Sequence, residues 1–250
     1  RLFSTAVLNA LTPRCTLKTE HDDGIRTKRI LWIDDLVTDK LLQGLDEGVV
    51  TAEAMSISRG LADLPGNVCT PAYLAEAVQN AAAGMTTVEV EVLDEHQIEE
   101  LGMGAFLSVA KGSTVPPRFI AIRYRGTNAA LPPVAFVGKG ITFDTGGISL
   151  KPAANMADMT YDMSGAAVVI GTVMAAARAK LPVNLLGVVA ACENLPSGSA
   201  AKPGDVVTSL SGKTIEILNT DCEGRMILAD ALTWTCLLYT SPSPRDKRQS

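Results

Sequence analysis

The sequence predicts an α/β protein in which a mostly parallel sheet is flanked by helices. From residue 70 onward, short apolar or alternating segments typical of strands alternate with longer segments of helical periodicity. The 250-residue chain is 47% hydrophobic and has a formal net charge of −5. It therefore has enough apolar residues for a sizeable core and too little net charge for disorder.

The first part of the chain is expected to be a remnant of an N-terminal α/β domain. Residues 1–40 contain one apolar strand candidate, residues 29–33, and are too few to fold alone. A helix over residues 39–62 follows, because apolar residues recur three or four positions apart. A Leu-Pro-Gly-Asn turn at residues 64–67 ends it. Residues 41–66 thus form a linking helix and turn.

A second domain is expected over residues 67–235. Its predicted strands are residues 87–93, 118–124, 134–137, 183–191 and 214–218, and its predicted helices begin at residues 70, 94, 164 and 225. The wholly apolar segment 134–137 is expected at the centre of the sheet. Residues 236–250 break this pattern with a polar, basic, proline-containing stretch, so we expect a non-native tail there.

Composition and missing motifs exclude several classes of protein. The longest apolar stretch, residues 166–177, is shorter than the ~20 residues that cross a bilayer, so no membrane partner is expected. No basic run dominates the body of the chain, so nucleic acid is not indicated. The absence of HExxH and GxSxG motifs argues against a zincin or a common serine hydrolase. Five widely spaced cysteines without a CxxC pair indicate a reducing, cytoplasmic protein.

Charged residues gather in two glycine-containing segments, each of which follows a predicted strand. Residues 137–152 with 160–166, and residues 218–226, together contain Lys139, Asp144, Lys151, Asp162, Asp221, Glu223 and Arg225. In parallel α/β sheets, ligands bind at this edge. A single aspartate in a glycine-rich turn is usually only a turn residue, but seven charged residues in two such segments make that interpretation weak.

The four carboxylates suggest a metal centre. Brought together, they would repel one another and their pKa values would rise, and two divalent cations would offset this charge. The side chains of Asp221 and Glu223 can share one side of an extended segment. Beside a dication the pKa of Lys139 should fall, so that its neutral amine could be a ligand. Lys151 and Arg225 would stay cationic and could stabilise an oxyanion.

These segments resemble the signature of the leucyl aminopeptidase family, the di-zinc cytosolic peptidases. The similarity covers residues 138–152, 161–166, 192–196, 203–205 and the Asn-Thr-Asp-x-Glu-Gly-Arg sequence at 219–225, and extends over roughly residues 58–234. The last motif is highly specific to the family. The resemblance implies that residues 67–235 are part of a metallopeptidase catalytic domain.

The resemblance also implies roles for individual residues and for the whole protein. Two divalent ions, zinc or manganese with magnesium as a further option, would activate a water that removes leucine-like N-terminal residues from peptides with a free N-terminus. The parent protein would be a homohexamer. The implied metal ligands are Lys139, Asp144, Asp162, Asp221 and Glu223, with Asp144 and Glu223 bridging, and the implied catalytic residues are Lys151 and Arg225, the latter holding a bicarbonate.

Two departures from the family pattern qualify this expectation. Cys222 replaces the usual alanine between two of the ligands, and a thiol so close to metal ions could bind them or oxidise. The chain ends soon after the signature, so we expect it to be inactive alone, with activity in the full-length parent. One alternative is a non-catalytic assembly or binding module of the same fold. Another is a different dinuclear hydrolase such as a phosphatase, which the lysine ligand and the scarcity of histidine disfavour.

Overall fold

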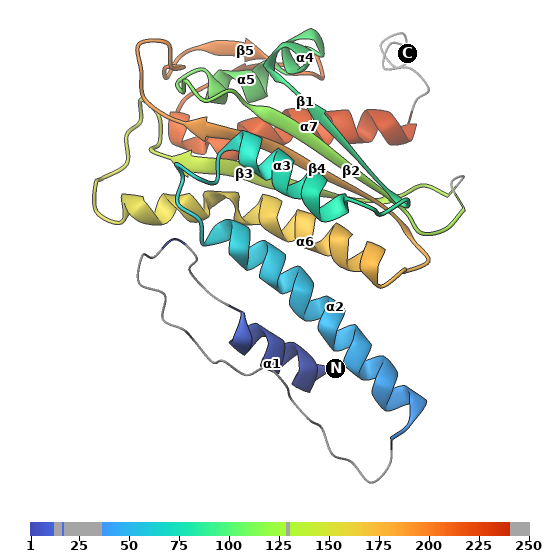
Figure 1. Ribbon diagram of the computed structural model, residues 1–250. Helices are drawn as coiled ribbons and strands as arrows, with labels where there is room; N and C mark the ends of the chain where they lie inside the picture. The colour runs from blue at the N-terminus through green and yellow to red at the C-terminus, as the bar shows by residue number, and fades with distance from the viewer. Residues whose placement is uncertain (13–16, 18–36, 129–130, 241–250) are drawn as a thin grey trace.

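The α/β fold class is confirmed. The structure, a computed structural model, describes residues 1–12, 17, 37–128 and 131–240. A four-stranded sheet lies between two sets of helices, with α2, α3 and α6 on one side and α4, α5 and α7 on the other (Figure 1). The helices and their 3-10 extensions are α1 (Leu2–Leu11), α2 (Asp39–Ala62), α3 (Pro71–Ala82), α4 (Glu95–Glu100), α5 (Gly104–Ala110), η1 (Met156–Met163), α6 (Ser164–Arg178), η2 (Thr220–Cys222) and α7 (Glu223–Thr240).

The sheet is mixed rather than mostly parallel. Its strands lie in the order β1 (Val88–Leu93), β2 (Arg118–Arg125), β4 (Asn184–Asn194), β3 (Val134–Asp144). Among the described residues, β3 and β4 pair in parallel, whereas β1–β2 and β2–β4 are antiparallel. The reason is where the chain re-enters the sheet. Leu93 pairs with Phe119, so α4 and α5 return the chain to the same end, whereas α6 crosses over between β3 and β4.

Two further strand predictions need correction. β4, not β3, is the strand buried along its whole length, and β3 lies at the edge of the sheet, with Val134 57% exposed. An apolar run of four residues does not reveal whether its strand has neighbours on both sides, and at the edge of this sheet the side chains of Val134 and Phe136 stay exposed. The predicted strand near residue 214 is β6 (Thr214–Glu216), which pairs with β5 (Val206–Thr208) in a separate two-stranded sheet.

Alternate side chains of the strands form two cores, one on each face of the sheet. On β2, Ile120 and Ile122 pack with α3 and α6, whereas Phe119 and Ala121 pack with α5 and α7. This alternation is what the period of two in a strand requires. The two cores hold the ends of β3, α6 and α7 in fixed relative positions.

The ends of the described chain bear on the predicted domain boundaries. α1 packs on α2, where Ser4 Oγ donates to Leu45 O (3.2 Å) and Thr5 Oγ1 donates to Gly48 O (3.1 Å). The strand predicted at residues 29–33 and the tail from residue 241 lie outside the described residues. α7 continues to Thr240, past the predicted boundary at residue 235. The division into domains stays a prediction.

One helical run, Met156–Arg178, is long and apolar enough to pass a length-and-composition test for a membrane span among the described residues. It consists of η1 and α6, and half of its most apolar part is buried in the protein. Core helices pass the same test, and α6 packs against β3 and β4.

Candidate metal centre

The end of β3 supplies the first side chains of the site. α6 approaches this strand closely, because a Cβ at Gly138 would lie 2.7 Å from Gly165 O. The register with β4 shifts between Ile141 and Asp144, so the strand is irregular where its carboxylate leaves the sheet. Asp144 Oδ1 accepts a hydrogen bond from Gly146 N at 2.8 Å, which fixes the carboxylate at the strand end.

Lys139 joins two carboxylates from different elements. Its Nζ lies 2.8 Å from Asp162 Oδ2 on η1 and 2.6 Å from Glu223 Oε1 at the start of α7. A Cβ at Gly224 would lie 3.0 Å from the same nitrogen, so the lysine side chain runs directly against the first turn of α7. Only a residue without a Cβ leaves it that space.

Lys151 makes the corresponding bridge on the other side. Its Nζ lies 2.9 Å from Asp144 Oδ2 and forms a short ion pair with Asp221 Oδ1. The backbone holds it there, because Lys151 N donates to Thr145 O at 2.9 Å. Two lysines and four carboxylates thus form one charged cluster.

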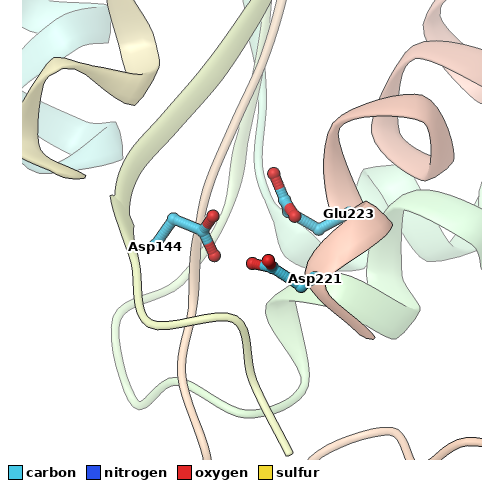
Figure 2. Close-up of side chains that lie close together, drawn as sticks. All are labelled: Asp144, Asp221 and Glu223. Atoms are coloured by element: carbon cyan, nitrogen blue, oxygen red, sulfur yellow. The ribbon is translucent and has the colours of Figure 1, made fainter. Parts of the chain in front are cut away.

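Three of the carboxylates converge directly. Asp144, Asp221 and Glu223 each offer an oxygen within 4.8 Å of the others, and Figure 2 shows their side chains pointing toward one another from β3, η2 and α7. Asp162 lies outside this trio and joins it through Lys139. Six of the seven charged residues predicted from the sequence therefore belong to the cluster, each within ion-pair distance of another member.

The segment carrying Asp221 and Glu223 is helical rather than extended, which corrects the predicted geometry. Asn219 Oδ1 accepts from Asp221 N at 2.8 Å and starts the turn of η2, and Glu223 opens α7. An acidic residue in the first turn of a helix is favoured by the helix dipole. The two carboxylates still meet, because the chain turns between them.

The pKa values in the cluster follow from burial and charge. Burial, opposed by the hydrogen bond and charge of Lys139, raises the pKa of Asp162 and of Glu223. Burial alone would lower the pKa of Lys139, but its two carboxylate partners outweigh burial and raise it. The pKa of Lys151 is raised in the same way, because its partners Asp221 and Asp144 outweigh burial. The predicted fall for Lys139 required a neighbouring dication, and the carboxylates by themselves have the opposite effect.

The donor set fits divalent cations. Four carboxylates against two ammonium groups leave a surplus of two negative charges. Glu223 is 3% exposed, and its Oε2 is buried without a hydrogen-bond partner among the described residues. Asp162 Oδ2 is also buried, with the Lys139 ion pair but no well-aligned hydrogen bond. Buried carboxylate oxygens with free lone pairs are hard ligands, which suit zinc, manganese or magnesium.

Arg225 does not join the cluster. Its side chain is exposed on α7 and makes no hydrogen bond or ion pair with any residue the structure describes. Cys222 is a half-buried free thiol between Asp221 and Glu223.

Some residues next to the site carried no prediction. Asn194, Ser149 and Thr220 hydrogen-bond the segments that carry the carboxylates. All three lie within segments that resemble the family signature, and Asn194 is also a polar residue at the end of the long apolar segment that forms β4.

The fold and the site define a class: an α/β protein with a carboxylate–lysine centre suited to divalent cations, placed where β3 and the start of α7 meet. A sequence model described as "cytosol aminopeptidase family, catalytic domain" matches residues 56–243. The chain therefore belongs to the cytosol aminopeptidase family, as the resemblance implied.

Individual relatives agree with this membership. The chain is 54% identical over 222 residues to a probable cytosol aminopeptidase of Azoarcus sp. (strain BH72), covering 89% of this chain and 44% of the relative. It is 55% identical over 221 residues to one from Bordetella pertussis, covering 87% and 44%. A solved structure, "Bottromycin maturation enzyme BotP in complex with Mn", is similar with a TM-score of 0.74 and 36% identity, covering 83% of this chain and 44% of that one. The chain thus spans less than half the length of these relatives.

Proposed function

We propose that the whole protein is a metal-dependent aminopeptidase that hydrolyses leucine-like N-terminal residues from peptides. The observation that carries the proposal is the meeting of Asp144, Asp221 and Glu223, from segments far apart in the sequence, within 4.8 Å of one another. Family membership supports the same reaction class.

Five side chains would hold two divalent ions: Lys139, Asp144, Asp162, Asp221 and Glu223. Zinc or manganese is proposed, with magnesium as a further option, and the solved structure of BotP in complex with Mn supports a metal of this kind. When bound, such a pair polarises a carbonyl and lowers the pKa of a bound water. The buried, hydrogen-bond-free Oε2 of Glu223 is available as a ligand atom.

Two cationic side chains would serve the reacting groups. The Lys151 ammonium lies among the carboxylates, 2.9 Å from Asp144 Oδ2, and can stabilise negative charge that develops on the substrate carbonyl oxygen. The Arg225 guanidinium is exposed and lacks a carboxylate partner among the described residues, so it is available to hold a small anion such as bicarbonate. An anion held by Arg225 would supply a general base when bound.

The wider setting follows the family. We propose a peptide with a free N-terminus as substrate and the cytoplasm as the location, in keeping with the names of the relatives. A homohexamer is proposed as the assembly from the family resemblance alone. We also propose that catalysis requires the full-length protein and that the 250-residue chain alone is inactive, because a preorganised site needs the rest of its supporting structure.

The test is turnover of leucine p-nitroanilide by the full-length protein with added Mn²⁺ or Zn²⁺. Asp221→Asn and Glu223→Gln should each reduce kcat/KM by more than ~100-fold, a larger effect than loss of an outer-shell partner. Asp46→Asn, on the exposed side of α2, is the matched control and should leave turnover unchanged. Turnover that survives complete removal of metal would reject the proposal, and metal binding without turnover would favour a non-catalytic module.

A further inference from the structure

Asn194 lies between the two segments that carry the carboxylates. It is the last residue of β4, is only 4% exposed, and stands opposite Asp144 in the register of the β3–β4 pair. A buried polar side chain needs partners, and those of Asn194 come from both segments.

The amide group of Asn194 bridges the segments. Its Nδ2 donates to Asp144 Oδ1 at 2.8 Å and to Thr220 O at 3.0 Å. Both partners only accept hydrogen bonds, so the network fixes which end of the amide faces them. The backbone takes part as well, because Asn194 O accepts from Thr145 N at 2.9 Å and from Thr145 Oγ1 at 2.8 Å.

Thr220 closes the connection from the other side. Its Oγ1 donates to Gly146 O at 2.6 Å and accepts from Ser149 N at 2.8 Å. Ser149 Oγ in turn accepts from Thr220 N at 3.2 Å. The loop after β3 and the turn before α7 are therefore tied by hydrogen bonds in both directions. We call Asn194, Thr220 and Ser149 the polar clamp.

The polar clamp is also tightly packed. A Cβ at Gly147 would lie 2.8 Å from Asn194 Oδ1 and 3.0 Å from Thr220 Oγ1, and the φ of Gly147 is +67°. Glycine alone fits there comfortably. The loop is thus held against Asn194 and Thr220 by shape as well as by hydrogen bonds.

We propose that Asn194 is a positioning residue of the metal centre, acting through Asp144 and through the turn that carries Asp221. Its amide occupies Asp144 Oδ1, so the other oxygen, Oδ2, is the one presented to Lys151 and the cluster. Its second hydrogen bond fixes the position of the Thr220 carbonyl group, directly before Asp221 in the chain. The inference rests on the proposed function, because it assumes that these carboxylates bind metal.

The same strand offers a matched control. Asn184, the first residue of β4, is 8% exposed, and its Nδ2 donates to Asn128 O at 2.8 Å and Leu131 O at 3.0 Å. Asn184 thus ties a loop to the opposite end of the strand with the same chemistry. Truncation of either asparagine removes two side-chain-to-acceptor hydrogen bonds from a buried site, but only Asn194 contacts a carboxylate of the cluster.

The experiment compares Asn194→Ala, Asn184→Ala, Thr220→Val and Thr220→Ser in the full-length protein. The readouts are Mn²⁺ affinity by calorimetry, unfolding by urea, and hydrogen exchange of residues 144–151 and 219–223. Asn194→Ala and Thr220→Val should weaken Mn²⁺ binding about 10- to 100-fold, as loss of outer-shell partners does, and should speed exchange in both segments. Asn184→Ala should lose stability without either effect. Thr220→Ser, which keeps the hydroxyl group, should bind Mn²⁺ with an affinity near that of the wild type.

Each outcome decides the inference. Wild-type affinity in Asn194→Ala, or an equal loss of affinity in Asn184→Ala, overturns the positioning role while leaving the metal centre intact. Wild-type full-length protein that binds no Mn²⁺ rejects the proposed function, and the polar clamp is then judged by exchange alone. Unchanged hydrogen exchange in residues 219–223 of Asn194→Ala would overturn the positioning role of Asn194.

Discussion

Gly224→Ala should weaken metal binding while leaving the stability of the fold nearly unchanged. Gly224 is in the first turn of α7, and a Cβ there would lie 2.9 Å from Cδ, 3.0 Å from Cε and 3.0 Å from Nζ of Lys139. Ordinary contacts of a Cβ begin at 3.4 Å, so the lysine must move by about 0.4–0.5 Å. Its end is flexible and can move, but it then leaves its place 2.6 Å from Glu223 Oε1.

The Gly224→Ala change should affect the free energy of unfolding and the Mn²⁺ affinity differently. Alanine is a better helix former than glycine by up to ~1 kcal/mol, which offsets a weakened ion pair, so the free energy of unfolding should stay within about 1 kcal/mol of wild type. A shift of ~0.5 Å is at the limit that a preorganised site tolerates, so Mn²⁺ affinity should fall by about 10-fold or more. Calorimetric titration with Mn²⁺ and urea unfolding measure the two quantities separately.

Gly60→Ala is the matched control. Gly60 is also helical, in α2, and a Cβ there would meet no atom within 4 Å. This variant should be more stable by about 0.5–1 kcal/mol and should bind Mn²⁺ as the wild type does. If Gly224→Ala binds Mn²⁺ as tightly as Gly60→Ala, the position of the Lys139 amine does not matter to the centre and our reasoning is refuted.

Three further predictions concern other parts of the molecule. Asp230 is fully buried, and its carboxylate accepts hydrogen bonds from Phe106 N and Leu210 N, both at 2.8 Å. Asp230→Asn should lower the free energy of unfolding by about 1–3 kcal/mol, measured with urea, because the amide NH₂ cannot accept a hydrogen bond. A loss below ~0.5 kcal/mol would contradict this. Burial raises the pKa of Asp230 despite these hydrogen bonds, so the folded protein holds its proton more tightly than the unfolded chain, and wild-type stability falls as pH rises from the unfolded pKa near ~4 through the folded one. The stability difference between wild type and Asp230→Asn should therefore narrow with rising pH, and a widening difference would show the sign to be wrong. Arg225→Ala should change stability by less than ~0.5 kcal/mol and leave Mn²⁺ affinity unchanged while lowering kcat of the full-length protein; a loss of Mn²⁺ affinity would place Arg225 among the ligands instead.

Local patterns predicted the elements of this fold better than their arrangement. The helix over residues 39–62 was predicted within its observed bounds, because apolar periodicity and the turn at Pro65–Gly66 are local signals. The direction of strand pairing was not, because it depends on the end at which a connection re-enters the sheet. The pairing of Leu93 with Phe119 is a long-range property that no window of sequence contains.

The candidate site shows the same division. The charged residue types and their spacing indicated which side chains to gather, and the structure brings Asp144, Asp221 and Glu223 together. The helical turn at η2 was missed, although Asn219 is a good N-cap residue and could have suggested it. Asn194 was missed for another reason, because a single polar residue at a strand end does not reveal that its partners lie 50 residues before it and 26 residues after it.

The central claim is that carboxylates from separate segments gather here to hold a pair of cations. Anomalous X-ray diffraction from crystals of the full-length protein grown with Mn²⁺ tests it most directly. The account predicts two anomalous peaks about 3.5–4 Å apart, bounded by the side chains of Asp144, Asp221 and Glu223. Peaks elsewhere, or an empty cluster in which both lysines keep their ion pairs at saturating Mn²⁺, would contradict it.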